Sequence, residues 1–267
     1  MVQHGKFNNR IYLMKYHKDD QPYLFDRMNE LVNLNGYSKI IAKIPAWAQP
    51  IFLIEGYSQE AYIPGFYKGT ESACFMAKYF DPERSVIPNK SLSTLAGLLS
   101  DPQENNSLPL PKQLTMEITE PRHVREMAEV YQQVFKTYPF PITDADYLEK
   151  TMKDGSVIYF GIRDQGKLIG LSSAEMDIPN KNAEMTDFAI LPKYRGQKLA
   201  LFLLGKMEEE MRKKQFQTLY TIARLDSPGM NKTFINHNYH FSGVLKNNTN
   251  ISGQIESMNV YYKTIKK

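Results

Sequence analysis

Apolar and polar residues follow a clear pattern between positions 184 and 211. The apolar residues at 189–191 stop at Pro192, which has no N–H group to donate to a strand ladder. Beyond a polar stretch, apolar residues recur at helical spacing: Leu199, Phe202, Leu203, Met207 and Met211. The pattern predicts a buried strand, a turn over residues 194–198 and a helix that begins near Leu199.

The same criteria predict further strands and helices along the rest of the chain. In the first hundred residues we expect strands at 7–16, 39–44, 61–67 and 72–80, and helices at 22–35, 46–54 and 91–99. Later we expect strands at 114–118, 157–163, 167–177, 219–224, 240–245 and 255–263, and helices at 124–135, 144–152 and 230–236. The Asn-rich residues 247–250 fall in the connection between the last two strands.

Residues 100–111 are rich in Pro, Asn and Ser, a composition typical of a linker. We therefore predict an N-terminal domain at 1–100, a linker at 101–112 and a second domain at 113–267. Strands and helices occur together in both domains, so the predicted fold class is α/β (α+β).

Composition narrows the classes of function. The net charge of +4 is too mild to argue for nucleic-acid binding, and no stretch approaches the about 18 apolar residues of a membrane span. The five histidines are scattered and Cys74 is the one cysteine, so we expect no metal site and no internal disulfide. Residues 1–10 lack the apolar core of a signal peptide. We predict a soluble cytoplasmic protein.

The turn before Leu199 has the properties of a phosphate-binding site. The first N–H groups of a helix have no partner within the helix, and they lie at the positive end of its dipole. Gly196 lets the backbone approach a ligand closely, and Arg195 and Lys198 add positive charge. We expect a diphosphate here, although a plain turn with solvated basic residues fits these residues about as well.

The order of the predicted elements resembles that of the GNAT acetyltransferase superfamily, which has a mixed central sheet flanked by helices. Residues 195–200, Arg-Gly-Gln-Lys-Leu-Ala, resemble its acetyl-CoA turn Arg/Gln-x-x-Gly-x-Gly/Ala, except that Lys198 replaces the middle glycine. The resemblance implies acetyl-CoA as cofactor and a strand N–H that stabilises the thioester oxyanion. The implied cofactor-binding residues are Phe188, Ala189, Ile190, Arg195, Gly196, Gln197, Lys198, Leu199, Ala200 and Asn231.

Several segments are similar to the β-lysine N-acetyltransferase family, at 138–142, 184–189, 220–224, 230–231 and 256–263. That family also has an N-terminal domain of this size, so the resemblance covers essentially the whole chain. It implies transfer of an acetyl group from acetyl-CoA to the ε-amine of β-lysine, which gives a compatible solute. Spacing and composition do not indicate this substrate.

Acetyl transfer needs a base, because an ε-amine with a pKa of about 10.4 is protonated at neutral pH. Glu184 stands where some GNAT enzymes carry a general base on the central strand, and Asp187 is the second candidate. Alternation places these two residues on opposite faces of a regular strand, so both can face the acetyl group only if a bulge intervenes. Either can instead be a structural carboxylate.

The general acid for the thiolate is less clear. In the superfamily a tyrosine of the last short helix often fills this role, and the corresponding residue here is Phe234. Water, Tyr239 or His237 is then the candidate proton donor.

The implied substrate is a zwitterion with a second amine. Arg224 is our candidate for its carboxylate, since a guanidinium binds a carboxylate through two hydrogen bonds. Glu175, Asp187 and Asn231 are candidates for the second ammonium, and Tyr138 and Phe140 for the aliphatic stem. Asn248 and Asn259 are further candidates for substrate hydrogen bonds, although an Asn-rich turn explains Asn248 equally well.

The N-terminal domain contains a weak internal repeat, since residues 41–43 resemble 222–224 and residues 56–57 resemble 238–239. We therefore interpret it as a degenerate GNAT-like half without a CoA turn. We expect it to pack against the catalytic domain, where it shapes the amine pocket or forms the face of a homodimer. Two alternative functions remain at this point: acetylation of another small amine or of a protein, and acyl-CoA binding without turnover.

Overall fold

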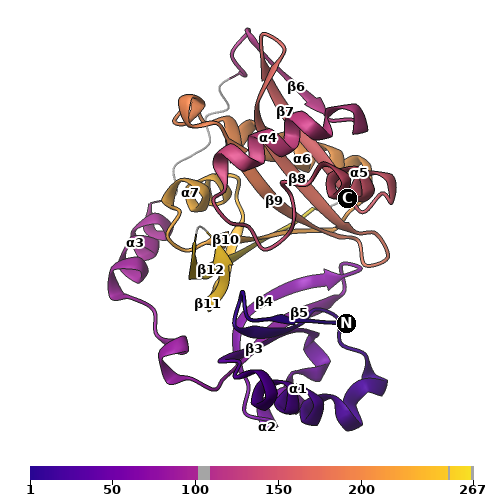
Figure 1. The fold of residues 1–267 in the computed structure, drawn as a ribbon, viewed down its shortest axis with the longest axis vertical. Helices are drawn as coiled ribbons and strands as arrows, with labels where there is room; N and C mark the ends of the chain where they lie inside the picture. Colours follow the sequence, from indigo (N-terminus) through magenta and orange to yellow (C-terminus); the bar gives the residue numbers. More distant parts are fainter. Residues whose placement is uncertain (102–108, 252, 266–267) are drawn as a thin grey trace.

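Two mixed β-sheets form the body of the protein, as a computed structural model of residues 1–101, 109–251 and 253–265 describes it (Figure 1). The first sheet has the order β1-β2-β3-β5-β4. Together with α1 and α2 it makes up what we call the N-terminal half. Its elements are β1 (Val2–Gly5), β2 (Arg10–Leu13), α1 (Gln21–Asn35), β3 (Lys39–Pro45), α2 (Gln49–Ile54), β4 (Ser58–Tyr67) and β5 (Glu71–Tyr79).

The second sheet has the order β11-β12-β10-β9-β8-β7-β6 and belongs to the C-terminal half. Its strands are β6 (Leu114–Ile118), β7 (Val157–Asp164), β8 (Lys167–Asp177), β9 (Asn182–Ile190), β10 (Thr218–Arg224), β11 (His240–Ile251) and β12 (Gln254–Thr264). The helices are α4 (Val124–Val134), α5 (Ala145–Lys153), α6 (Leu199–Lys213) and α7 (Pro228–Asn236). The predicted α/β fold class is therefore confirmed.

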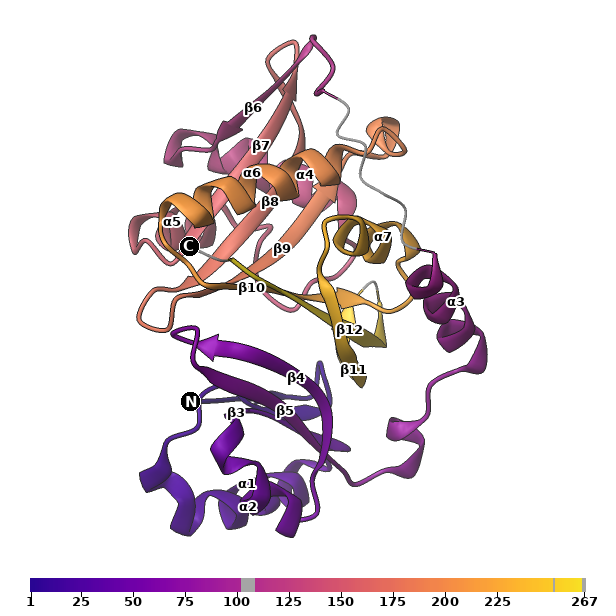
Figure 2. The ribbon, with the colours of Figure 1, turned by 180° about the vertical axis from the view of Figure 1, so that it is seen from behind.

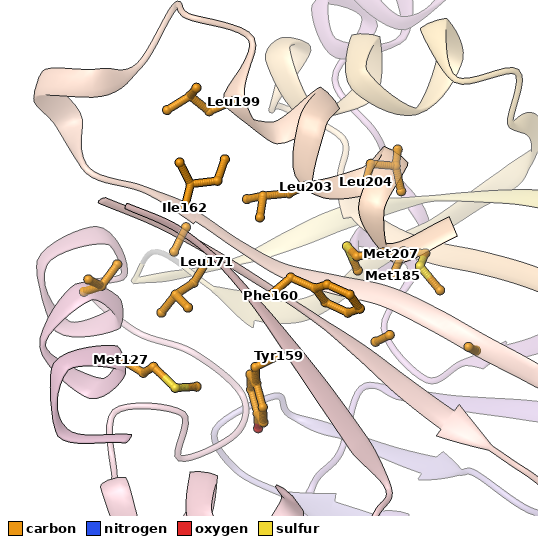
Figure 3. Close-up of a cluster of buried hydrophobic side chains, with 14 of the residues drawn as sticks. Met127, Tyr159, Phe160, Ile162, Leu171, Met185, Leu199, Leu203, Leu204 and Met207 are labelled. Atoms are coloured by element: carbon orange, nitrogen blue, oxygen red, sulfur yellow. The ribbon is translucent and has the colours of Figure 1, made fainter. Parts of the chain in front are cut away.

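Helices pack on both faces of the second sheet, because neighbouring residues of a strand point to opposite sides. Phe160 lies on the side of α6, close to Met207, whereas the Tyr159 ring points to the other side, near Met127 of α4 (Figure 3). The Tyr159 hydroxyl lies 2.9 Å from the Thr151 Oγ1 atom of α5. This core holds β8 and β9, the strands that carry Glu175, Glu184 and Asp187.

Two differences from the predicted elements concern polar strands. β1 has the sequence Val-Gln-His-Gly, which carries no apolar pattern, and it is a strand because it pairs with β2. The Asn-rich residues 247–250 lie within β11 rather than in a connection. Their polar groups bond to the N-terminal half, as when Asn247 Nδ2 donates to the carbonyl oxygens of Arg84 and Val86. Pairing with the neighbouring β2 thus decides β1, and partners distant in sequence hold the polar end of β11.

The N-terminal half repeats the topology of the last part of the chain. In β2-β3-β5-β4 the first two strands are parallel, are joined by a helix and are followed by an antiparallel hairpin. The strands β9-β10-β12-β11 have the same order, directions and connections. This shared topology supports our interpretation of the first domain as a GNAT-like half.

The helix α3 (Asn89–Ser100) crosses from one half to the other. It packs against α7, and Leu98 and Leu99 contact the core of the C-terminal half. Residues 102–108 of the predicted linker lie outside the described residues. The domain boundaries therefore stay a prediction. No helix in the described ranges is long and apolar enough to cross a bilayer.

The two halves share a buried core, and β4 lies beside β11 at their contact (Figure 2). Alternation divides the residues of β3, because Ile40 packs under α1 and α2 whereas Ile41 faces the C-terminal half. The shared core includes Ile41, Ala61, Phe75, Leu245, Met258 and Val260. The N-terminal half is thus packed on the sheet that carries the site residues.

One glycine at this contact gives a direct test of the packing. A Cβ atom on Gly243 of β11 would lie 2.0 Å from the carbonyl oxygen of Glu60 in β4. We expect Gly243→Ala to push the strands apart and to lower the free energy of unfolding in urea by about 1–3 kcal/mol. Gly229→Ala is the control, because its added methyl group meets no atom within 4 Å. An equal loss in both variants would contradict this explanation.

Candidate active site

The centre of the second sheet opens between β9 and β10. The two parallel strands pair at three positions, the last of which joins Tyr220 to Glu184. Beyond this pair β9 continues to Ile190 and β10 to Arg224 without pairing to each other. The divergence leaves a wedge whose walls carry backbone and side-chain groups of both strands.

A cavity of about 590 Å³ occupies the region of this wedge. One wall comes from the C-terminal half, through β8, β9, β10 and residues 138–140. The other comes from the N-terminal half, through side chains of β1, β2 and β3. The cavity is therefore built between the halves, in line with the expectation that the first domain shapes a pocket.

Five acidic residues line this cavity, and three of them, Glu175, Glu184 and Asp187, are predicted site residues; the other two are Asp154 and Asp177. Glu175 of β8 stands directly opposite Glu184 of β9 in the antiparallel ladder. The register shifts between the pairs of Leu171 and Ser173, and Asp187 has a φ of 55°. This bulge turns Asp187 to the face of the strand on which Glu184 lies. Both carboxylates can therefore face the same cavity, which a regular strand would not allow.

Burial raises the pKa of all three carboxyl groups. The pKa of Glu184 rises to about 7, because desolvation outweighs the attraction of Lys43 and the contact with the Tyr220 hydroxyl. The pKa of Glu175 rises well above its ordinary value, first through burial and then through repulsion by Asp187 and Glu184. Glu184 is therefore poised to exchange a proton near neutral pH.

Hydrogen bonds hold Asp187 in place. Its carboxylate accepts from the Ser173 hydroxyl and from the Tyr138 hydroxyl. Burial raises the pKa of Asp187, and these hydrogen bonds oppose the rise. Tyr138, expected to line the aliphatic stem of the substrate, thus also fixes a carboxylate, while Phe140 lines the cavity as an apolar wall.

Lys43 is a site residue that the sequence analysis did not propose. It reaches the cavity from β3, and its Nζ lies 5.2 Å from the ring centre of Phe66 and 5.8 Å from that of Tyr220. Burial lowers the pKa of Lys43, and the nearby Glu184 opposes this shift. The sequence feature that could have indicated Lys43 is the repeat, because it aligns residues 41–43 with residues 222–224.

Arg224 lines the cavity but already has an acidic partner. Its Nε and Nη2 donate to the two carboxylate oxygens of Glu256, at 2.6 and 2.7 Å. This bidentate pair neutralises the guanidinium charge and occupies the Nε–Nη2 fork that would bind a second carboxylate. The geometry therefore gives little support to Arg224 as the group that binds a substrate carboxylate.

Asn231 and Asn259 are fully buried and do not line the cavity. Asn231 Nδ2 donates to the carbonyl oxygens of Arg224, Leu225 and Ser227, and its Oδ1 accepts from Asn259 Nδ2 at 2.8 Å. These bonds tie α7 to the end of β10. The structure thus places both amides in the framework beside the site, whereas Asn248 does line the cavity.

The candidate proton donors lie outside the cavity wall. Tyr239 is buried, and desolvation together with the nearby Glu208 raises the pKa of its hydroxyl well above the ordinary value. His237 Nδ1 lies 3.4 Å from Glu208 Oε1. Phe234, at the position where a tyrosine is usual, does line the cavity and packs edge-on against Phe188.

The predicted phosphate turn follows β9 and is exposed at residues 195–198. Gly196 has a φ of 82°, and Lys198 adopts the left-handed conformation with a φ of 58° at the start of α6. Lys198 thus has a backbone conformation that glycine adopts readily, so replacing the usual glycine keeps the shape of the turn. Leu199 is buried and Ala200 is half-buried, which anchors the helix end. The turn therefore fits a diphosphate.

Diverging parallel strands, a phosphate turn at the start of a long helix and an acidic cavity together define an N-acetyltransferase of the GNAT fold. The model of the "Acetyltransferase (GNAT) family" matches residues 124–234. The chain belongs to this family, as the resemblance predicted, and it is an acyl-CoA-dependent N-acetyltransferase.

Two relatives match over nearly the full length. The β-lysine N(6)-acetyltransferase of Methanococcus maripaludis is 37% identical over 264 residues, which cover 98% of this chain and 95% of the relative. The N-acetyltransferase YodP of Bacillus subtilis is 31% identical over 269 residues, or 99% and 96% of the two chains. The similarity therefore includes the N-terminal half.

Solved structures share the fold over part of the chain. The spermidine/spermine N-acetyltransferase SpeG of Vibrio cholerae superposes with a TM-score of 0.50 and 20% identity, covering 58% of this chain and 95% of that one. The ribosomal L7/L12 α-N-protein acetyltransferase RimL in complex with coenzyme A gives a TM-score of 0.50 and 17% identity, covering 59% and 97%.

Proposed function

We propose that this protein transfers the acetyl group of acetyl-CoA to the ε-amine of β-lysine and so forms N-epsilon-acetyl-β-lysine, a compatible solute. The observation that carries the proposal is the acidic cavity between the two halves, which suits a small cationic amine. The full-length similarity to a β-lysine N(6)-acetyltransferase supports the choice of amine. We further propose that residues 1–100 form an accessory domain whose role is to close this cavity.

In this reaction Glu184 acts as the general base. It takes a proton from the ε-ammonium, and the free amine attacks the thioester carbonyl carbon. A C–N bond forms, the C–S bond breaks and CoA leaves as a thiolate, while the second proton lost by the amine nitrogen passes through water to the thiolate. The developing oxyanion accepts a hydrogen bond from a backbone N–H of β9, for which Phe188, Ala189 and Ile190 remain the candidates. We assign protonation of the thiolate to water, since Tyr239 and His237 do not line the cavity.

Residues 195–200 would hold the diphosphate of the cofactor through backbone N–H groups and the charges of Arg195 and Lys198. We expect Lys198→Glu to raise the KM for acetyl-CoA roughly tenfold with little change in kcat, because a carboxylate then repels the diphosphate. Lys18→Glu, at an exposed site in the N-terminal half, is the control. Equal KM values in Lys198→Glu and the wild type would argue against this site.

The substrate is tested by thiol release from acetyl-CoA with β-lysine, α-lysine, polyamines and a lysine peptide as acceptors. We expect the highest kcat/KM with β-lysine. Turnover with the peptide but with none of the free amines would favour a protein acetyltransferase. Binding of acetyl-CoA without thiol release in any mixture would favour a regulator instead. The position of the cavity between the two halves supports a free amino acid over a protein segment.

A further inference from the structure

One buried cation of the cavity wall has no acidic partner. Arg10 of β2 is 6% exposed and lines the cavity. Its Nη1 donates to the backbone oxygen of Asn248 and to Thr249 Oγ1. Within the described ranges, no carboxylate oxygen lies within 4.0 Å of its guanidinium nitrogens. A guanidinium carries five N–H donors, so most of its hydrogen-bonding capacity is left for a ligand.

The other cations at the contact between the halves have acidic neighbours or several protein partners. Arg224 is half-buried and pairs with Glu256, and the half-buried Lys43 is attracted by Glu184, Asp177 and Glu175. Arg84 is also buried, but its Nε, Nη1 and Nη2 each donate to protein oxygens and it does not line the cavity. Arg10 thus combines burial, access to the cavity and free donors.

The surroundings of Arg10 are unfavourable for an unpaired charge. Burial lowers its pKa to about 10, and the nearby Arg84 adds to the lowering. A buried cation without a counter-ion is destabilising unless a ligand supplies one. An anion bound here would therefore be held strongly, through two charge-assisted hydrogen bonds in a site largely shielded from water.

The position of Arg10 suits an elongated zwitterion. The Arg10 guanidinium lies 5.3 Å from the ring centre of Tyr12, which also lines the cavity. Burial raises the pKa of the Tyr12 hydroxyl, and the charge of Glu184 adds to the rise whereas that of Arg10 opposes it. The main influences on Arg10 itself include no acid. Tyr12 therefore separates a cationic end of the cavity from an acidic end.

We propose that Arg10 binds the carboxylate of the amino-acid substrate while the acids of β8 and β9 receive its amines. This inference rests on the proposed function, and it names the N-terminal half as the part that selects an amino acid over a polyamine. Arg10 takes the role that the sequence analysis gave to Arg224. It is a specificity residue and takes no part in proton transfer.

The test compares two substrates in one variant. The wild type should prefer β-lysine over its carboxamide, 3,6-diaminohexanamide, by roughly ten- to a hundredfold in kcat/KM, the range of a hydrogen-bonded charge pair. In Arg10→Gln this ratio should fall to about one, mainly through a higher KM for the acid, and the KM for acetyl-CoA should not change. An unchanged ratio in Arg10→Gln would overturn the proposal.

Arg84→Gln is the matched control, because it removes a buried guanidinium that bonds to the same strand, β11, but lies outside the cavity. It should lower stability and keep the acid-to-amide ratio. If Arg10→Gln does not fold, Arg10→Lys serves instead. Its acid-to-amide ratio of kcat/KM should be several-fold lower than that of the wild type, since an ammonium cannot make the two parallel hydrogen bonds of a guanidinium. A ratio of one in the wild type would also refute the role of Arg10. If the wild type acetylates neither compound, the proposed function itself fails.

Discussion

Replacing Glu184 by glutamine should lower kcat for β-lysine about 10²- to 10⁴-fold at pH 7, the usual contribution of a general base. The amide has nearly the same shape but cannot accept the proton of the ε-ammonium. The KM for acetyl-CoA should stay close to that of the wild type, because residues 195–200 lie apart from the cavity wall. Steady-state rates of thiol release measure both quantities.

The pH profile gives the same prediction a second readout. Protonated Glu184 cannot act as a base, so wild-type kcat/KM should fall as the pH drops below about 7, the pKa to which burial raises this group. In Glu184→Gln this limb should vanish, and the rate should recover towards pH 10 as the free amine accumulates.

Asp187→Asn tests the second candidate base under the same conditions. If Asp187→Asn abolishes the acidic limb and Glu184→Gln retains it, the base is Asp187. In that case Glu184, which stands opposite Glu175 in the ladder, has only an electrostatic role.

Glu60→Gln should lower the free energy of unfolding by about 3–5 kcal/mol, the effect of removing one partner of a buried ion pair. Lys39 Nζ lies 2.8 Å from Glu60 Oε2, and the two side chains are 0% and 2% exposed. Lys39 also donates to the Lys246 carbonyl oxygen at 2.7 Å, and the Lys246 N–H donates to Glu60 at 2.9 Å. The glutamine variant would leave Lys39 charged and buried at the contact between the halves.

Urea denaturation at pH 7 measures this loss, with Glu30→Gln as the control. Glu30 pairs with Arg27 at the surface, where both side chains are more than half exposed, so its loss should stay below about 1 kcal/mol. Burial lowers the pKa of Lys39 to about 8, below its value in the unfolded chain. Glu60 opposes this lowering, so the pKa of Lys39 should fall further in folded Glu60→Gln. The defect of Glu60→Gln should therefore shrink as the pH rises towards about 8 and stay constant above it, because Lys39 is then neutral in both folded proteins. A change within 1 kcal/mol at pH 7 would refute the role of the pair.

Local patterns predicted most elements of this fold. The helix after the phosphate turn begins at Leu199 as the apolar spacing indicates, and β6 has the predicted bounds. Such elements follow from side-chain periodicity and from the backbone limits of glycine and proline, which act over a few residues. The strand β1 was missed because it has no apolar pattern and forms through pairing with β2, and the full length of β11 was missed because its polar end bonds to the N-terminal half.

The sequence by itself determined the GNAT fold, the turn between β9 and α6 and the presence of carboxylates on the central strand. Only the tertiary structure decided that Glu184 and Asp187 share one cavity, because a one-residue bulge changes the face of a strand without a clear mark in the sequence. It also decided that Arg10 and Lys43 form the opposite wall. More than 140 residues separate Lys43 from Glu184, and contacts at such separation arise from the packing of whole sheets and leave no local periodicity.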